Sequence, residues 1–314
     1  MELRNRVTEY LDYCKYRKEL DEKSLKAYRI DLRQFFAFCG SSNPQKAQIE
    51  KYITELHKKY KQKTIKRKIA SIKAFYNYLE EEEVISETPF RKIRVKFKEA
   101  IILPRIIPRK EIELLLNYMY QTGSKHNMES KTFRYCLRDI AVIETFFATG
   151  ARVYEISNIR AQGIDLESGL LRITGKGDKE RYVQIGCAEV LDTLRRYYAS
   201  NKKDIEKSGY FFINNRGGRY SEQSIRGMLK KYTILAGIER NITPHMFRHS
   251  VATYLIEEGV DISCIQQIFG HSSIRTTQIY IHVAARKQAE ILKIYHPRRN
   301  MKIDITKNMC PVVS

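Results

Sequence analysis

The sequence has 314 residues, which is enough for two domains that each bury their own core. Its 57 Lys and Arg residues against 36 Asp and Glu give a formal net charge of +21, which favours a polyanionic partner such as nucleic acid. A basic protein that is merely well solvated is the alternative. The chain has no apolar run of about 18 residues and no secretory signal, so we expect a cytoplasmic protein without membrane contact. Six scattered cysteines without a C-x-x-C pair favour free thiols over a zinc site.

The N-terminal part is predicted to form a bundle of four helices, the first over residues 3–16. Apolar residues recur at three- and four-residue steps over residues 25–39, 49–60 and 65–79, as on one face of a helix. Ser24 is predicted to cap the second helix. A basic run follows the third helix, and we expect four of its residues to contact nucleic-acid phosphates: Lys63, Lys66, Arg67 and Lys68. A solvated helix face is the alternative for this run.

Prolines and basic β-branched residues over residues 89–108 predict an extended linker. The sequence therefore divides into a helical domain over residues 1–95, a linker over residues 96–108 and a second domain over residues 109–314.

The second domain is predicted to be mainly helical with a small antiparallel sheet. Two short β-type runs, residues 170–174 and 181–185, flank a glycine-rich turn and indicate a hairpin. Residues 211–213 are predicted to add a third strand or a buried edge. Helices are predicted over the following ranges: 111–120, 135–148, 189–198, 221–236, 244–258, 262–269 and 284–295.

Several residues in the second domain suit phosphate chemistry. His245 and Arg248 follow Pro244 at three-residue spacing, which places both on the first turn of a helix, where anions are favoured. Arg152 follows a turn and can grip a phosphate through two hydrogen bonds, or it can simply pair with Glu155. Lys176 lies at the tip of the predicted hairpin. Each residue alone is also compatible with an ordinary surface position.

Two further residues complete the set, and their order in the chain is distinctive. His271 follows a predicted helix end, and Tyr280 lies nine residues later. The sequence resembles the tyrosine recombinase (phage integrase) family, most closely its compact Xer-type members. The resemblance is carried by residues 149–155 (TGARVYE), 175–181 (GKGDKER), 245–253 (HMFRHSVAT) and 269–280 (FGHSSIRTTQIY). Departures are Phe269, where leucine is usual, and Ile281, where threonine often follows the tyrosine.

The resemblance implies a SAM-like core-binding domain followed by an α+β catalytic domain. It implies a site-specific recombinase that joins Tyr280 to a DNA 3′-phosphate and exchanges strands through a Holliday junction. The implied catalytic residues are Arg152, Lys176, His245, Arg248, His271 and Tyr280. Glu155 would orient Arg152 or a neighbouring loop, and His249 and His282 would have supporting roles.

Neither metal nor cofactor is implied, because arginines and a lysine supply the positive charge. The implied partners are double-stranded DNA with inverted repeats and three further copies in a homotetramer, with the helix over residues 284–295 donated to a neighbour. A type IB topoisomerase and a catalytically silent DNA-binding protein are the alternatives. The resemblance leaves open whether the reaction serves integration, excision, inversion or dimer resolution.

Overall fold

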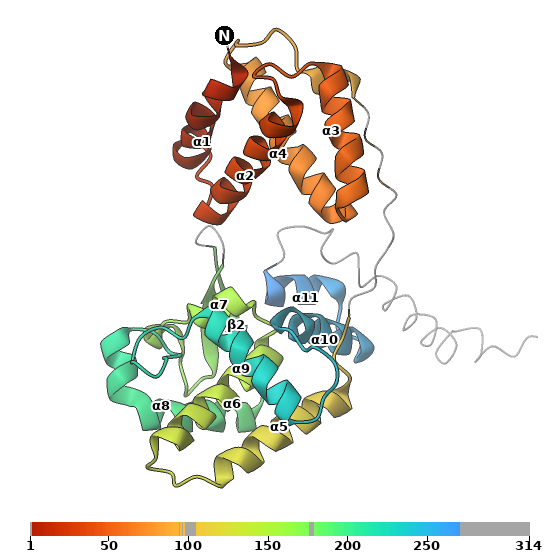
Figure 1. Ribbon diagram of the computed structural model, residues 1–314. Helices are drawn as coiled ribbons and strands as arrows, with labels where there is room; N and C mark the ends of the chain where they lie inside the picture. Colours follow the sequence, from red (N-terminus) through yellow and green to blue (C-terminus); the bar gives the residue numbers. More distant parts are fainter. Residues whose placement is uncertain (1, 94, 96, 98–104, 176–178, 271–314) are drawn as a thin grey trace, which may run out of the picture. The chain divides into compact units, whose positions relative to one another are not determined.

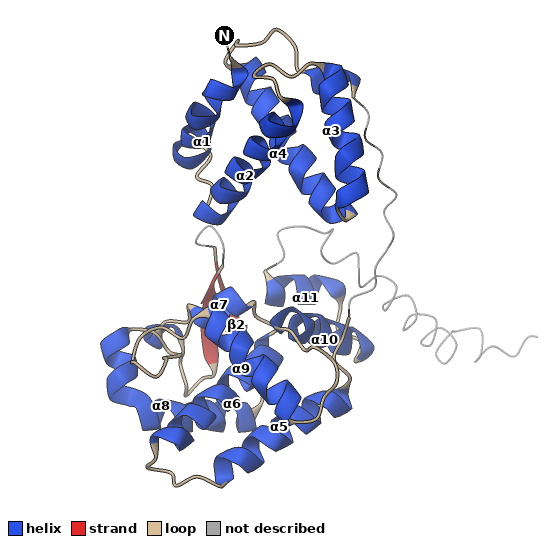
Figure 2. Ribbon diagram, viewed as in Figure 1, coloured by secondary structure: helices blue, strands red, loops and turns tan. Residues whose placement is uncertain are grey.

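The computed structural model describes residues 2–93, 95, 97, 105–175 and 179–270. The chain forms two compact units, residues 1–100 and 101–314 (Figure 1). Helices dominate both units, and the described residues contain a single two-stranded antiparallel sheet (Figure 2). The prediction of a mainly helical fold with a small antiparallel sheet is confirmed.

The first unit is a bundle of four helices. A 3-10 turn, Leu3–Arg6, leads into the first of them, and the helices are α1 (Val7–Tyr16), α2 (Glu22–Cys39), α3 (Lys46–Lys59) and α4 (Gln62–Glu81). Asp21, rather than Ser24, caps α2: its carboxylate accepts a hydrogen bond from the Ser24 backbone N–H at 2.8 Å. The prediction of Ser24 as the cap was wrong because the helix begins earlier, and an aspartate at its start also favours the helix dipole.

The core of this unit lies where the apolar stripes predicted it. Phe35 of α2 and Phe75 of α4 are fully buried, and aromatic rings pack edge to face around them. Tyr60, at the end of the predicted stripe of α3, is instead exposed, because the helix ends at Lys59.

The segment that joins the helices of the two units has apolar residues near both of its ends. Residues 89–92 form a 3-10 turn with Phe90 buried, and Ile93, Val95 and Phe97 pack against the first core. At the other end, Ile107 is buried in the second unit and its N–H donates to the Ser250 hydroxyl at 2.8 Å. Apolar residues at both ends of the predicted linker therefore belong to packed structure.

The second unit is built around α6. Its helices are α5 (Arg109–Ser124), α6 (Lys131–Thr149), α7 (Val153–Ser157), α8 (Ala188–Ser208), α9 (Glu222–Leu235), α10 (Pro244–Glu257) and α11 (Ile262–Phe269), with a 3-10 turn at Ala161–Gly163. Helices α5, α8 and α10 pack against α6, which is buried over most of its length. Helix α8 runs ten residues beyond its predicted end and stops at Gly209, which adopts the left-handed conformation that ends helices.

The predicted hairpin is present as β1 (Leu170–Thr174) paired antiparallel with β2 (Glu180–Gln184). Leu171 and Ile173 of β1 and Val183 of β2 face the core. Because Ile173 pairs with Arg181, Arg181 lies on this inner face as well. Residues 211–213 add no strand to the sheet in the described chain, and their side chains are buried, as the alternative prediction had it.

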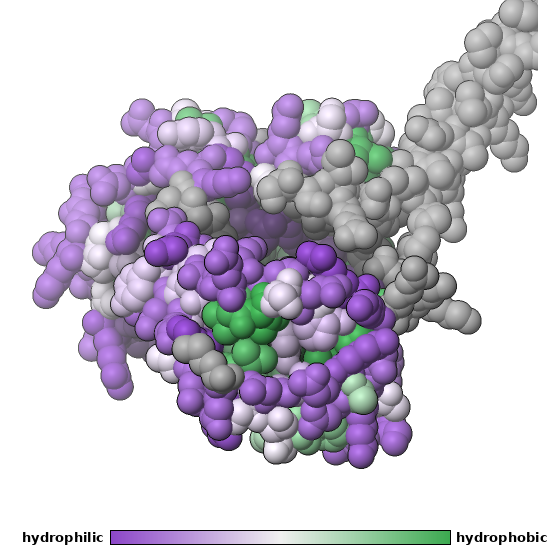
Figure 3. Space-filling view, turned by 90° about the horizontal axis from the view of Figure 1, so that it is seen from above, coloured by the Kyte–Doolittle hydropathy of each residue, from purple (hydrophilic) through white to green (hydrophobic). Residues whose placement is uncertain are grey.

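None of the helices in the described ranges is both long enough and apolar enough to span a lipid bilayer. Five cysteines lie in these ranges, and all are free thiols, as predicted: Cys14, Cys39, Cys136, Cys187 and Cys264. Hydrophilic residues cover most of the face shown in Figure 3, as expected for a chain with this charge.

Candidate active site

Arg152 lies at the turn where α6 ends and α7 begins. Gly150 closes α6 with a φ of +58°, and Arg152 precedes the first residue of α7. Its backbone N–H donates to Oε2 of Glu155 at 2.7 Å, and its Nη1 donates to Oε1 at 2.9 Å. The predicted pairing with Glu155 is therefore present. The Arg152 side chain is still 40% exposed, so the same guanidinium also faces solvent, from where a phosphate would approach.

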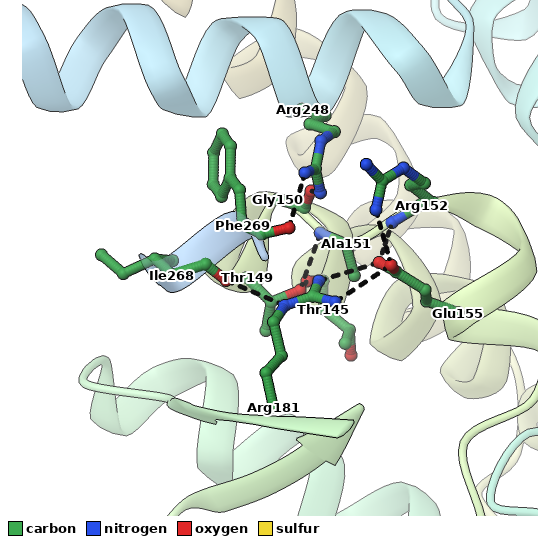
Figure 4. A network of polar contacts seen from close by, with 10 residues as sticks. All are labelled: Thr145, Thr149, Gly150, Ala151, Arg152, Glu155, Arg181, Arg248, Ile268 and Phe269. Atoms are coloured by element: carbon green, nitrogen blue, oxygen red, sulfur yellow. Dashed lines mark hydrogen bonds and ion pairs between the residues drawn. The ribbon is translucent and has the colours of Figure 1, made fainter. Parts of the chain in front are cut away.

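Glu155 is the centre of this site, with only 2% of its surface exposed. Besides Arg152, it holds Arg181 of β2 in a two-point contact, with Nη1 to Oε1 at 3.0 Å and Nη2 to Oε2 at 2.8 Å (Figure 4). Burial alone would raise the pKa of Glu155, but the hydrogen bonds and charges of Arg181 and Arg152 outweigh it and lower this pKa. Glu155 is therefore a permanent anion at neutral pH.

Arg248 of α10 is buried, with 5% of its surface exposed. Its Nη1 donates to the Gly150 carbonyl at 2.8 Å and its Nη2 to the Phe269 carbonyl at 2.7 Å. The guanidinium also lies over the Phe269 ring, 4.4 Å from the ring centre. These contacts fix Arg248 on the backbone two residues before Arg152.

The histidines of α10 differ in their surroundings. His245 is exposed on the first turn, directly after Pro244, while His249 is partly buried one turn later. Burial, followed by the charges of His245 and Arg248, lowers the pKa of His249. His249 is therefore mostly neutral at physiological pH.

Three of the predicted catalytic residues, Lys176, His271 and Tyr280, lie outside the described residues, as do Ile281, His282 and the helix predicted over residues 284–295. Their chain neighbours are described. A Cβ added at Gly175 would lie 3.7 Å from Oε1 of Glu155, and one added at Gly270 would lie 3.0 Å from Cδ of Arg181. The residues that precede Lys176 and His271 in the chain therefore both lie beside the Glu155–Arg181 pair.

Sequence reasoning missed Arg181 and the contact of Phe269 with Arg248. Arg181 stood in the quoted motif without a role. A usable signal was its position two and four residues before Val183 and Ile185, because alternate residues of a strand share a face and both of these residues are buried. For Phe269 the signal was only its departure from the usual leucine.

The basic run of the first unit is less exposed than predicted. Lys63 is exposed, Lys66 places its ammonium over the Phe97 ring at 5.1 Å, and Arg67 is half exposed and paired with Asp31. The predicted phosphate contact of Lys68 does not fit the structure: Lys68 is only 3% exposed, and its ammonium donates to Asp31 at 3.0 Å. Residues 65, 68, 69 and 72 share the inner face of α4, so Lys68 cannot contact DNA from there.

Among the residues that the structure describes, no group of three or more His, Cys, Asp or Glu side chains is placed to hold a metal ion. The charged groups at the Glu155 site are instead two arginines around one carboxylate, with a third arginine on the adjoining backbone. This arrangement suits binding of a phosphodiester through guanidinium groups.

Comparison with known proteins identifies the family. The model of the phage integrase family matches residues 105–287, and the model of the phage integrase N-terminal SAM-like domain matches residues 7–83. The chain therefore belongs to the phage integrase family. It is an enzyme of the tyrosine recombinase class, as its curated relatives are.

Two of these relatives cover nearly the whole chain. A tyrosine recombinase of Agathobacter rectalis is 45% identical over 95% of this chain and 98% of its own length. The tyrosine recombinase XerC of Thermodesulfovibrio yellowstonii is 33% identical over 93% of this chain and 96% of its own.

Solved structures share the fold at lower identity. The XerH site-specific recombinase bound to palindromic difH substrate, in a post-cleavage complex, aligns with a TM-score of 0.72 at 21% identity, over 93% of this chain and 85% of that one. A λ integrase dimer bound to a core site aligns with a TM-score of 0.68 at 14% identity, over 89% of this chain and 95% of that one.

Proposed function

We propose that the protein cuts and rejoins DNA at specific sites through a covalent 3′-phosphotyrosyl intermediate on Tyr280 and exchanges strands through a Holliday junction. The observation that carries this proposal is the arrangement of Arg152 and Arg248. Arg152 is held by the buried Glu155, and Arg248 of α10 donates to the carbonyl of Gly150. Both guanidinium groups are therefore anchored on the chain between Gly150 and Glu155. Family membership supports assigning that pair to the scissile phosphate.

In the proposed reaction, the phenolic oxygen of Tyr280 forms a bond to phosphorus while the bond to the 5′ oxygen breaks. The phenol proton passes to His245, and Lys176 gives a proton to the leaving 5′ oxygen. Arg152 and Arg248 bind the non-bridging oxygens, where preorganised donors supply about 3 kcal/mol each, and His271 donates a further hydrogen bond. The phosphotyrosyl ester conserves the energy of the DNA bond, so the reverse attack by a 5′ hydroxyl needs no ATP. Neither metal nor cofactor has a role in this scheme.

The proposed DNA partner is a duplex with inverted repeats. The XerH recombinase was solved on a palindromic substrate, which supports a site of this symmetry. We propose that the first unit is the core-binding domain and contacts DNA phosphates through Lys63, Lys66 and Arg67. The proposed location of the protein is the cytoplasm. Lys68 is not part of this proposal.

We further propose a homotetramer on two DNA sites, in which each copy donates residues 284–295 to the next. Deleting the residues after Lys287 is expected to weaken synapsis of two duplexes more than binding to one duplex. Native gel shifts with one and two labelled duplexes measure both. Equal loss of the two would contradict donation.

The test of the proposed chemistry is Tyr280→Phe. The DNA probe is a duplex that the wild-type chain selects from a random-sequence library, nicked beside the cleavage point so that the product cannot be rejoined. The variant keeps the ring, so DNA binding is expected to persist while the denaturant-stable adduct disappears. Tyr16→Phe, at an exposed tyrosine of the first unit, is the control and should form the adduct normally. An adduct in Tyr280→Phe would assign the nucleophile elsewhere, and a wild-type chain that never forms one would refute the proposed chemistry.

The topoisomerase alternative makes a different prediction. A type IB topoisomerase would relax a supercoiled plasmid that lacks the selected site, whereas a site-specific recombinase is expected to act only on a plasmid that carries it.

A further inference from the structure

Arg181 belongs to the candidate active site, but the proposed reaction gives it no step. Its side chain is only 12% exposed. Its two terminal nitrogens hold Glu155 of α7, and its Nε donates to the carbonyl of Ile268 in α11 at 2.9 Å (Figure 4). One residue of β2 thus joins two helices that lie more than a hundred residues apart in the sequence.

The two partners of Arg181 both lead to proposed catalytic groups. Glu155 is the carboxylate that holds the Arg152 guanidinium and backbone N–H. Ile268 is the next-to-last residue of α11, three residues before His271 in the chain. The carbonyls at the end of a helix have no partner within it, so arginine donors there define where the chain leaves the helix.

The chemistry of this contact requires arginine. A guanidinium presents several donors in one rigid plane, which lets Arg181 meet two carboxylate oxygens and a carbonyl at once. A lysine at the same place keeps the charge but cannot reproduce the planar two-point contact. Glu155 would then hold Arg152 less rigidly, and the end of α11 would lose one donor.

The hydrogen bonds of Arg181 indicate a role inside the protein, because they occupy all three nitrogens of its guanidinium group. Three N–H groups of Arg181 donate to atoms of the protein itself. We propose that Arg181 is a positioning residue of the cleavage reaction, which fixes Arg152 through Glu155 and fixes the end of α11 from which His271 and Tyr280 follow. This inference rests on the proposed function of the site.

The experiment compares Arg181→Lys with the wild-type full-length chain on the nicked, library-selected duplex. Misplacement of catalytic groups by about 1 Å is expected to slow adduct formation at saturating DNA by about 10- to 100-fold, while the dissociation constant stays within about twofold. Arg195→Lys is the matched control, because Arg195 also donates Nε to a backbone carbonyl, that of Leu166, at 2.9 Å but is exposed. The control should leave both quantities unchanged.

A second comparison separates positioning from a general loss of structure. Because part of the effect of Arg181 is proposed to pass through Arg152, the double variant Arg152→Lys/Arg181→Lys should cleave faster than the product of the two single-variant defects predicts. A general loss of structure would instead multiply the two defects, and that result would overturn the inference. The inference is also overturned if Arg181→Lys cleaves at the wild-type rate, or if its rate and affinity fall together. In each case the wild-type chain still forms the adduct, which distinguishes these results from failure of the proposed function.

Discussion

Replacing Glu155 by glutamine removes one negative charge from the centre of the arginine network and preserves the size of the side chain. Glu155 accepts four hydrogen bonds, two from Arg152 and two from Arg181, and is almost fully buried. The amide nitrogen of glutamine is a donor, so it would face the donors of an arginine. Removing one partner of a buried ion pair costs about 3–5 kcal/mol, and we expect about 3 kcal/mol here because both arginines retain some access to water.

Urea unfolding of the full-length chain, followed by far-UV circular dichroism, measures this loss, and thermal unfolding should show a decrease of about 6–12 °C in melting temperature. Glu167→Gln is the control: Glu167 is exposed in the same unit, and its replacement should cost less than about 0.5 kcal/mol. If Glu155→Gln destabilises the chain no more than Glu167→Gln, the account of the buried network is refuted.

The same pair of proteins should show a defined pH dependence. The folded-state pKa of Glu155 lies below its ordinary value of 4.5, so its ionised form stabilises the fold above that pH. The stability difference between the wild type and Glu155→Gln is therefore expected to be constant near neutrality and to shrink as the pH falls through the folded-state pKa. A difference that grows on acidification would contradict the assigned direction of the shift.

Three further predictions concern other parts of the chain. Lys63→Ala should weaken binding to any duplex and reduce the slope of the logarithm of the DNA-binding constant against the logarithm of the salt concentration by about 1. Lys68→Met should leave this slope unchanged and lower the free energy of unfolding by about 3 kcal/mol. Equal slopes for the two variants would contradict the assignment of Lys63 to the DNA surface and of Lys68 to the core. Gly150→Ala and Gly209→Ala both place a side chain at positive φ, but only the first directs its Cβ to within 2.5 Å of a buried ring. Gly150→Ala should therefore lose about 1–3 kcal/mol more of its free energy of unfolding, measured by urea unfolding, than Gly209→Ala; equal losses would argue against the close contact. Adduct formation on the nicked duplex should survive EDTA, and complete loss restored only by Mg²⁺ would contradict cleavage without metal.

The helical content of the fold could be predicted because its local signals agree with its tertiary packing. Apolar periodicity located α2, α3 and α4, and Thr149–Gly150 marked the end of α6. Predictions failed where a local rule competed with burial. Lys68 belongs to a basic run, but helical spacing turns it toward the core, where Asp31 compensates its charge. Residues 211–213 have strand propensity, but of the two predicted outcomes the buried edge is the one present, and their side chains pack in the core of the second unit.

The candidate site was predicted only in its separate parts. The residue types and their order indicated Arg152 and Arg248, and Glu155 was expected to orient Arg152 or a neighbouring loop. It contacts both Arg152 and Arg181, which a pattern along the chain cannot reveal because the partners lie on different elements. The contacts of Arg248 with backbone carbonyls could not be predicted either, because every residue has a backbone carbonyl and the sequence does not indicate which one is bonded.

Arg181 and Arg248 grip the end of α11 by its main chain, at the carbonyls of Ile268 and Phe269. Every amino acid carries a carbonyl, so these two bonds tolerate drift in side-chain identity as long as the helix itself is kept. This tolerance gives a physical reason why phenylalanine can occupy a position where leucine is usual without releasing the chain that follows. Selection at the end of α11 would then conserve the two arginines and allow the residues whose carbonyls they contact to vary.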